Sequence, residues 1–510
     1  MQNENSQSIK RIVIAGGGTS GWMAAALLSR HLRADMCEVT VVAPDDGAGL
    51  GVGEATIPSM LRLLSTLQAD EAEFMRACHA TWKLGIQFAD WVTKDRDNWH
   101  PFGVCGARID GRDLFPFWLN QKLQGGLQRP YHSYSLHWAA CLAGKCPHSQ
   151  SIQSPIVATQ SYAFHLDAAK FADWLRELAK VAGVKQQSGR IVDTNLQDDG
   201  LLKSVVLDDG QRVEGDFFID CTGFSSQLLR GTLQDPWVDW GQQLLCDRAV
   251  AVRGAATSVV PPYTRSLATT AGWIWEIPLA QRKGYGYVYS SDFVTDDQAW
   301  QQLREHSGLT EDTDIAPQLI NMHVGRQTSC WKQNVLAIGL SAGFVEPLES
   351  SGLHLTQVGI EQFLELFPSS GQWSSLQSEY NTRMTRVFDE VRDFVQLHYH
   401  LSHRDEPFWV AARDLALSPE LHHRLKLYDE AGVLPETHPD AFPDASYYYL
   451  LAGYGRLPRR APALAMSVDA ERLQFVLKAI QDQNQNIQRD LPLNEEVLKS
   501  IHNPAMLRAL

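Results

Sequence analysis

The sequence predicts an α/β fold with a Rossmann-like dinucleotide-binding core, a β-rich second layer and a helical C-terminal part. Two observations near the N-terminus predict the core. The apolar, β-branched run at residues 10–15 leads directly into a glycine turn at residues 16–21, and residues 22–32 then read as a helix. A second strand-like run, residues 38–43, follows at the separation expected for a βαβ unit.

The chain continues this alternation of strands and helices. A glycine-dense loop at residues 47–58 precedes a helix expected from about Ser59. Asp167 is expected to cap the helix that follows it, because a carboxylate accepts bonds from free backbone N–H groups. Two Asp-Asp-Gly turns separate strands within residues 189–223. Further strand-like runs occupy residues 248–252, 273–278, 285–291 and 335–339.

The last part of the chain is expected to be mainly helical. A helix is predicted from Gly352 onward, and another begins near residue 374. Its apolar stripe consists of Tyr380, Met384, Val387, Phe388, Val391, Phe394 and Val395. We expect residues 1–370 to form the core with its interleaved β layer and residues 371–510 to form the helical part.

Composition and charge exclude several classes of protein. The 510 residues have a mass of 57.0 kDa and are 44% hydrophobic, so a disordered chain is excluded. The formal net charge of −14 repels phosphate backbones and anionic lipid, which disfavours nucleic acid as a partner. No apolar run reaches the length of about 18 residues that a membrane-spanning helix needs. The N-terminus lacks the apolar segment of a secretory signal, so we expect a soluble, cytoplasmic protein.

Cysteine and histidine give little support to a metal site. The eight cysteines are scattered singly without a Cys-x-x-Cys pair, and no His-Glu-x-x-His motif accompanies the 17 histidines. No metal is therefore expected. The 15 tryptophans indicate either a flat aromatic pocket or a bulky core.

The glycine turn has the spacing of a dinucleotide site. Gly16, Gly18 and Gly21 stand between a strand and a helix, where backbone amides can meet a pyrophosphate. A structural turn is the alternative, and the motif does not choose between NAD and FAD. The acid that usually contacts a ribose is replaced by Ala43, with Asp45 and Asp46 just beyond it.

The chain contains several separated blocks of distinctive sequence: GGGTSGWMAA (16–25), GVGEATIP (51–58), TWKLGIQFADW (81–91), HPFG (100–103), DFFIDCTG (216–223), GWIWEIP (272–278) and GFVEPLESSGLHL (343–355). With these blocks the chain resembles the flavin-dependent tryptophan halogenases along nearly its whole length. The Trp-x-Trp-x-Ile-Pro block at residues 273–278 is the hallmark of that family. Leu340 stands where flavin-dependent aromatic hydroxylases have an aspartate, which argues for a related but distinct flavoprotein.

The resemblance implies a flavoprotein monooxygenase-type core and a two-step reaction. FADH2 from a separate flavin reductase reacts with oxygen to give a flavin hydroperoxide, which oxidises chloride or bromide to hypohalous acid. That acid passes through a tunnel to a small aromatic substrate. The matching catalytic residues here are Lys83, which holds or is chlorinated by the oxidant, and Glu349, which lies beside the ring.

The resemblance also implies the contacts of each ligand. His100, Phe102 and Glu349 would contact the substrate, and Trp273 and Trp275 would separate it from the flavin. The halide would bind at Ser350, Ser351 and Gly352. The FAD contacts would be Gly16, Gly17, Gly18, Thr19, Ser20, Gly21, Trp22, Glu54 and Ala55, with backbone contacts at Ile191, Leu340 and Leu353.

Elementary chemistry agrees with the two catalytic roles. A lysine fixes the oxidant over one ring carbon, and a carboxylate stabilises the cationic ring intermediate or takes its proton. The alternatives are a surface lysine at position 83 and a helix N-terminal carboxylate at position 349.

The substrate remains open at this point. The residues that grip the amino-acid end of free tryptophan find no clear match, and Pro443 and Ser446 stand where a tryptophan and an asparagine are expected. A simpler indole, another electron-rich aromatic or a larger indole-bearing molecule is at least as well favoured as free tryptophan. The other readings are an FAD-dependent aromatic hydroxylase and a flavin-binding protein without turnover.

Overall fold

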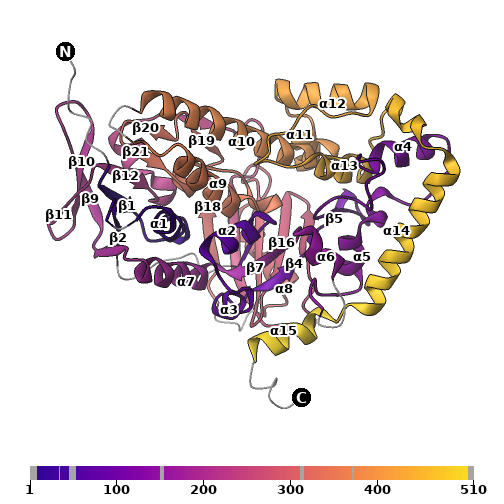
Figure 1. Cartoon of the computed structure of the whole chain (residues 1–510), viewed down its shortest axis with the longest axis horizontal. Coiled ribbons are helices and arrows are strands. Elements are labelled where there is room, and N and C mark those ends of the chain that lie inside the picture. Colours follow the sequence, from indigo (N-terminus) through magenta and orange to yellow (C-terminus); the bar gives the residue numbers. More distant parts are fainter. Residues whose placement is uncertain are drawn as a thin grey trace.

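The computed structural model describes residues 9–33, 35–44, 53–149, 154–310, 315–369 and 373–503. Two large sheets organise these residues. The sheet that contains the N-terminal strands lies toward one end of the long axis, and the C-terminal helices reach the other end (Figure 1). The predicted α/β class is confirmed.

The first large sheet is the Rossmann-like core. Its strand order is β20 (Trp331–Lys332), β21 (Val335–Ala337), β12 (Phe217–Asp220), β1 (Arg11–Ala15), β2 (Glu38–Ala43) and β8 (Lys185–Ser188). All neighbours are parallel except β20 and β21. The two predicted strands of the βαβ unit are confirmed as β1 and β2, with α1 (Thr19–His31) between them. β1 is therefore paired with a strand on each side, and its carboxyl end leads into the glycine turn.

Helices cover this sheet. α7 (Ala168–Val181) packs beside α1, and the predicted cap is confirmed, because Asp167 accepts hydrogen bonds from the amides of Ala169 and Lys170. α9 (Gly352–Glu365) packs against α1, and α10 (Ser374–Leu401) packs against α9. The predicted stripe of α10 is confirmed, since all seven of its members are buried.

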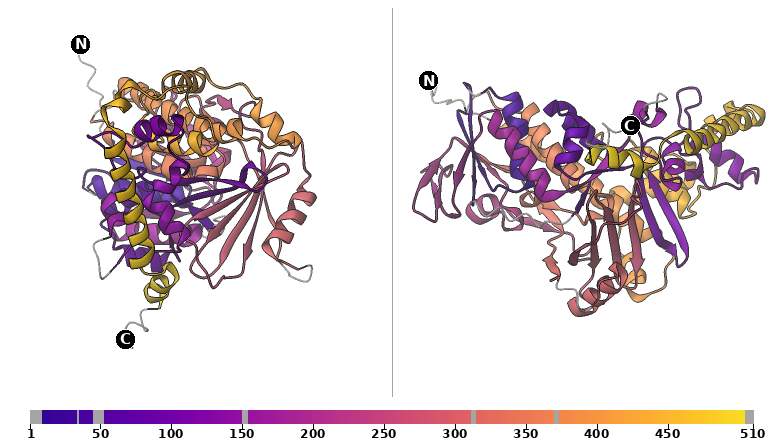
Figure 2. Two further views of the ribbon diagram at one scale, coloured as in Figure 1. Left: turned by 90° about the vertical axis from the view of Figure 1, so that its right-hand side faces the viewer. Right: turned by 90° about the horizontal axis from the view of Figure 1, so that it is seen from below.

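The second large sheet has seven strands and projects from one side of the molecule (Figure 2). Its order is β18 (Gln318–Asn321), β14 (Arg248–Gly254), β17 (Lys283–Tyr289), β16 (Gly272–Pro278), β15 (Thr264–Thr269), β5 (Gly85–Thr93) and β6 (Arg96–Pro101). Only β15 and β5 run parallel. α8 (Asp296–Ser307) packs on β14 and β17. This sheet is the predicted β-rich layer.

A small sheet joins the two layers. It consists of β3 (Gly53–Ala55), β7 (Ala163–Asp167) and β4 (Thr81–Lys83). Thr81 Oγ1 donates a 2.6 Å hydrogen bond to the carbonyl of Pro278 on β16. His165 Nε2 lies 2.9 Å from Thr264 Oγ1 on β15. These buried bonds fix β4 against the seven-stranded sheet.

Two further three-stranded sheets complete the β structure. One contains β11 (Arg212–Glu214), β10 (Leu202–Leu207) and β9 (Ile191–Leu196), and the predicted strands and turns of residues 189–223 are found there and in β12. The other contains β13 (Trp237–Asp239), β19 (Gly325–Gln327) and β22 (Gly343–Phe344).

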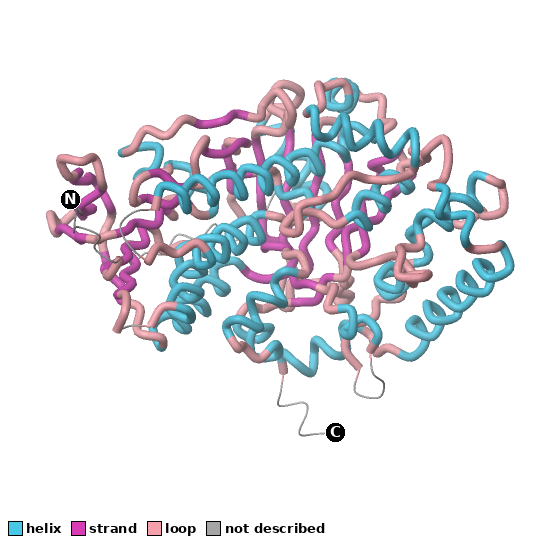
Figure 3. Tube along the Cα trace, turned by 45° about the horizontal axis from the view of Figure 1, so that its top comes forward, coloured by secondary structure: helices cyan, strands magenta, loops and turns pink. Residues whose placement is uncertain are grey.

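Helices make up most of the remaining structure (Figure 3). Residues 53–160 contribute α2 (Ser59–Leu67), α3 (Glu71–Ala77), α4 (Phe115–Leu123), α5 (Leu136–Leu142) and α6 (Pro155–Thr159). Residues 403–503 contribute α11 (Pro407–Arg413), α12 (Pro419–Ala431), α13 (Asp444–Gly453), α14 (Ala470–Asp490) and α15 (Asn494–His502). The expected boundary at residue 370 falls outside the described residues. In the part of the chain that the structure describes, no helix has the length and apolar character needed to cross a membrane.

Candidate active site

The glycines of the turn after β1 serve different purposes. A Cβ on Gly16 would lie 2.3 Å from the Cys221 carbonyl oxygen, and one on Gly21 would lie 1.9 Å from the Gly16 oxygen. A Cβ on Gly17 would lie 2.4 Å from the Cβ of Ala43. A Cβ on Gly18, in contrast, would meet no protein atom within 4 Å. Gly18 therefore leaves space for a ligand at the N-terminus of α1, which fits the pyrophosphate of a dinucleotide.

Most of the other predicted FAD contacts surround this turn. Ser20 Oγ would lie 2.2 Å from a Cβ on Gly339, in the 3-10 turn that contains Leu340. Ser20 Oγ also lies 3.4 Å from Thr356 Oγ1, in the first turns of α9 after Leu353. Trp22 is buried in the first turn of α1.

The small sheet brings β3 close to the N-terminus of α1. Thr19 Oγ1 donates to the carbonyl of Ala168 at 3.4 Å, directly after β7. β3 pairs with β7, with Glu54 opposite Leu166 and Ala55 opposite His165. Burial raises the pKa of Glu54 to about 7.

Ile191 lies farther along, on the β9–β10–β11 sheet. It pairs with Leu207, and the preceding Gly189 donates its amide to the carbonyl of Ala43 at 3.2 Å. Ile191 is thus near the carboxyl end of β2, where the second half of a dinucleotide extends in this fold class. Asp45 and Asp46 lie outside the described residues.

Asp220 joins the segments around the turn. Its carboxylate accepts hydrogen bonds from the amides of Leu228 and Leu229, both at 2.9 Å, and from the Ser341 hydroxyl at 3.1 Å. This residue ends β12, so one buried carboxylate fixes the loop after β12 against the segment that contains Leu340.

Lys83 is buried at the end of β4, so the surface alternative is excluded. Its Nζ donates a 2.7 Å hydrogen bond to Ser350 Oγ and lies 5.2 Å from the ring centre of Phe102. Burial lowers the pKa of Lys83 to about 7, although the nearby Glu349 carboxylate opposes this change. The side chain therefore exists as both ammonium and amine near neutral pH.

Glu349 lies beside Lys83 with two imidazoles. It is fully buried in the 3-10 turn Pro347–Glu349. His100 Nδ1 donates to its carboxylate at 2.8 Å, and His398 Nε2 donates at 2.7 Å. Burial alone raises the pKa of Glu349, but the two imidazole donors outweigh burial and keep the pKa below its ordinary value. Glu349 is therefore an ionised, hydrogen-bonded carboxylate.

The sequence analysis did not identify His398. This residue continues the buried stripe of α10 one turn beyond Phe394 and Val395, and its side chain is fully buried. Burial lowers the pKa of His398, although the bond to Glu349 opposes this effect. The sequence signal that could have identified His398 is a histidine on a helix stripe that is otherwise apolar.

Aromatic rings surround His100. Its ring centre lies 6.3 Å from that of Phe102, so these two predicted substrate contacts lie close together. The rings of Phe394, Phe442 and Tyr449 lie 5.7 Å, 6.2 Å and 6.2 Å from it. The sequence analysis did not single out these three as site residues. They come from α10, from the connection between α12 and α13, and from α13.

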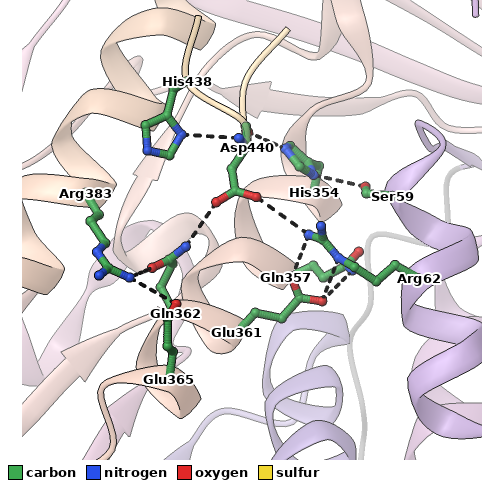
Figure 4. Close-up of polar contacts among 10 residues, drawn as sticks. All are labelled: Ser59, Arg62, His354, Gln357, Glu361, Gln362, Glu365, Arg383, His438 and Asp440. Carbon is green, nitrogen blue, oxygen red and sulfur yellow. Dashed lines mark hydrogen bonds and ion pairs between the residues drawn. The ribbon is translucent and has the colours of Figure 1, made fainter. Parts of the chain in front are cut away.

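The connection that contains Phe442 is anchored to α9 (Figure 4). His354 Nε2 donates to the carbonyl of Asp440 at 2.7 Å, and Ser59 Oγ donates to His354 Nδ1 at 2.9 Å. Gln362 donates to the Asp440 carboxylate at 3.0 Å, and Arg62 lies 3.9 Å from it. The α2 helix, the α9 helix and this connection therefore share one polar network.

Ionic groups near this connection bind protein partners. Besides the Asp440 network, Arg424 lies 4.0 Å from Glu390 and 4.4 Å from the Tyr447 ring centre. Glu390 also accepts a hydrogen bond from the His438 amide at 3.1 Å. Pro443 caps α13 and Ser446 is buried. These charges are already compensated within the protein.

The start of α9 offers unpaired polar groups. Ser350 donates its amide to the Pro347 carbonyl and uses its hydroxyl for Lys83. Ser351 Oγ is buried and has no hydrogen-bond partner among the described residues. A Cβ on Gly352 would meet no atom within 4 Å. The helix N-terminus beside Ser351 and Gly352 therefore suits an anion.

Trp273 and Trp275 share one face of β16, as predicted from their spacing, and both are buried. The Trp275 ring lies over Gly286, where a Cβ would come within 2.2 Å of it. The Trp273 ring lies 6.4 Å from Trp91, whose ring lies 5.9 Å from His398.

Several known proteins are similar to this chain over most of its length. A family model described as tryptophan halogenase matches residues 11–470. A tryptophan 6-halogenase from Streptomyces toxytricini is 34% identical over 522 residues, which cover 96% of this chain and 98% of that protein. A tryptophan 7-halogenase from Lentzea aerocolonigenes is 32% identical over 98% of this chain and 99% of its own length. The structure of a flavin-dependent halogenase from Xanthomonas campestris superposes with a TM-score of 0.91 at 36% identity, covering 97% of this chain and 99% of that one.

Proposed function

The chain belongs to the tryptophan halogenase family and is a flavin-dependent halogenase, and we propose that it uses Lys83 and Glu349 to halogenate an uncharged, indole-like aromatic. The observation that carries this proposal is the burial of both residues beside one another, with Ser350 bonded to Lys83 and His100 bonded to Glu349. The matches do not favour the aromatic hydroxylase alternative.

The turn at Gly16–Gly21 and its neighbours would hold FAD. The open space at Gly18 supports a pyrophosphate there, and Glu54, Ala55, Leu340 and Leu353 surround the same helix N-terminus. Ile191 would contact the far end of the cofactor. Reduced FAD, when bound, supplies the chemistry that converts oxygen and halide into hypohalous acid.

The halide site in this proposal is the start of α9. The unpaired Ser351 hydroxyl and the space beside Gly352 support it. Ser350 bonds to Lys83 and so connects the halide site with the lysine.

Lys83 would deliver the oxidant to the ring. Its ammonium form donates a hydrogen bond to the oxygen of hypohalous acid and so makes the halogen more electrophilic. Burial excludes water, which would otherwise compete for that bond. Phe102 and His100 would hold the aromatic ring beside Lys83.

Glu349 would stabilise the cationic ring intermediate. Its negative charge is retained at neutral pH because two imidazole N–H groups bond to it. A fixed carboxylate in a dry site lowers the energy of a nearby positive charge much more than it would in water.

The substrate would be an aromatic without a zwitterionic end. A zwitterion needs charged or hydrogen-bonding partners, whereas the ionic groups near Phe442 already bind each other. Residues 371–510 would complete the pocket through Phe394, Phe442 and Tyr449. Trp273 and Trp275 would keep the flavin apart from this pocket, and a separate reductase would supply FADH2.

The test is incubation of the enzyme with a flavin reductase, NADH, FAD, bromide and separate samples of indole and free tryptophan. We expect a product with the bromine isotope doublet from indole and little from tryptophan. A hydroxylated product that forms without bromide would overturn the proposal. Bound FAD without any halogenated product would support a flavin-binding protein instead.

A further inference from the structure

Halogenation of a ring must remove one proton, and the surroundings of Glu349 make it a poor acceptor. This inference rests on the proposed function. Glu349 already accepts hydrogen bonds at 2.8 Å from His100 Nδ1 and at 2.7 Å from His398 Nε2. Protonation of Glu349 would cancel the charge that both bonds stabilise. The carboxylate therefore stabilises charge well but binds a proton weakly.

His100 has a free basic nitrogen in the right place. Because Nδ1 donates to Glu349, the neutral ring carries its lone pair on Nε2. Nε2 makes no hydrogen bond with any residue that the structure describes. His100 lies on β6, and its ring centre lies 6.3 Å from that of Phe102, which follows the end of this strand. Lys83 Nζ lies 5.2 Å from the centre of the Phe102 ring. Lys83 and His100 thus flank the same aromatic ring.

His398 is less suited to this task. Its bond to Glu349 uses Nε2, and its free Nδ1 is completely buried without a partner in the described structure. Its ring packs 4.4 Å from Phe88 and 5.9 Å from Trp91. His398 is fully buried, whereas His100 keeps 3% of its surface exposed. His398 therefore serves to position Glu349.

We propose that Nε2 of His100 is the base that takes the ring proton, while Glu349 positions His100 and stabilises the imidazolium that forms. The O–X bond of hypohalous acid breaks as the C–X bond forms. The oxygen keeps the electron pair, takes a proton from the Lys83 ammonium and leaves as water. The ring C–H bond then breaks, its electron pair restores the aromatic system, and the proton passes to His100. Return of that proton to Lys83 closes the cycle.

Few other titratable groups face His100 from the elements around it. Glu349 comes from the 3-10 turn, His398 from α10 and Lys83 from β4. Tyr449 comes from α13, and burial keeps its pKa above the ordinary tyrosine value. Tyr454 follows α13, and burial raises its pKa in the same way. Both tyrosines stay protonated and uncharged near neutral pH.

The test compares His100→Asn with His398→Gln in single-turnover bromination of indole and of ring-deuterated indole. Asparagine keeps an N–H donor for Glu349 but has no basic nitrogen, and glutamine keeps the donor that His398 provides. We expect His100→Asn to slow bromination by about 10²-fold, the range for loss of a general base. It should also show a primary isotope effect that the wild type lacks, because proton removal becomes rate-limiting. His398→Gln should lose less rate and show no isotope effect.

His100→Gln is a second variant in case the asparagine variant folds poorly, and thermal melting reports folding in each case. An unchanged rate with no isotope effect in a folded His100 variant would overturn the inference. So would a primary isotope effect of equal size in His398→Gln. A wild-type enzyme that fails to brominate indole would instead contradict the proposed function.

Discussion

The Nζ atom of Lys83 lies 2.7 Å from the Oγ atom of Ser350, although 267 residues separate them in the chain. This bond connects the buried lysine of β4 to the segment that opens α9. Ser350 has a φ angle of +59°, a backbone conformation that few residues other than glycine adopt readily. The serine is thus placed by a turn that directs its hydroxyl to Lys83.

Replacement of Ser350 should misplace Lys83 without removing it. A hydrogen bond to a charged group contributes about 1.5–3 kcal/mol, so Ser350→Ala should lower the yield of halogenated product per flavin oxidised by about tenfold or more. Ser350→Gly accepts the positive φ angle without strain and serves as the matched variant. The yield is measured by product mass spectrometry against peroxide released. An unchanged yield in both variants would show that the bond does not matter.

The buried Lys83 should make folding stability depend on pH. Its pKa is about 7 in the folded protein and 10.5 when unperturbed, so the unfolded chain binds more protons between these values. Stability contributed through Lys83 therefore rises with pH, by up to about 1.4 kcal/mol per pH unit. Lys83→Met lacks this dependence, so its stability relative to the wild type should fall from pH 7 to pH 10. Denaturant unfolding of both proteins measures the difference, and a constant difference would contradict burial of the lysine.

A methyl group at Gly352 should obstruct the halide. A Cβ there meets no protein atom within 4 Å, so Gly352→Ala is expected to fold normally. We expect the KM for bromide to rise by about tenfold, equivalent to about 1.4 kcal/mol, with a smaller rise for chloride because that ion is smaller. Steady-state kinetics with varied halide provide the measurement. Equal KM values in the variant and the wild type would place the halide elsewhere.

Gly18 and Gly21 should respond differently to the same substitution. Gly18→Ala leaves the fold unchanged but fills the space at the N-terminus of α1, so the Kd for FAD should rise while the bromide KM stays constant. Gly21→Ala puts a Cβ 1.9 Å from the Gly16 oxygen and should lower the melting temperature instead. Fluorescence titration with FAD and thermal melting separate the two effects. Tight FAD binding by Gly18→Ala would rule out a pyrophosphate at this turn.

The sequence predicted elements whose signals are local. The strand, glycine turn and helix of residues 11–31, the cap at Asp167 and the buried stripe of α10 follow from periodicity and capping chemistry, and all are found. The hydrogen-bond partners of Lys83 and Glu349 could not be predicted from local sequence patterns, because they come from distant parts of the chain. Lys83 and Ser350 are neighbours only in the folded chain, where the hydrogen bond from Thr81 to Pro278 holds β4 against the seven-stranded sheet.

Some site residues carried weak signals. His398 lies on an apolar stripe of α10. The sequence does not distinguish a histidine that only packs in the core from one that donates a hydrogen bond to a carboxylate. Phe442 lies in an irregular connection that Asp440 anchors to His354, a contact between residues 86 positions apart. Such contacts depend on how α9 packs against the connection before α13, which no local pattern encodes.

The most direct measurement compares the wild type with Lys83→Met in the presence of reductase, NADH, FAD, bromide and indole, with product mass and peroxide release followed together. We expect the wild type to give bromoindole, and Lys83→Met to oxidise reduced flavin at a similar rate, release peroxide and give no bromoindole. Bromoindole formed by Lys83→Met at the wild-type rate would contradict delivery of the oxidant by this lysine.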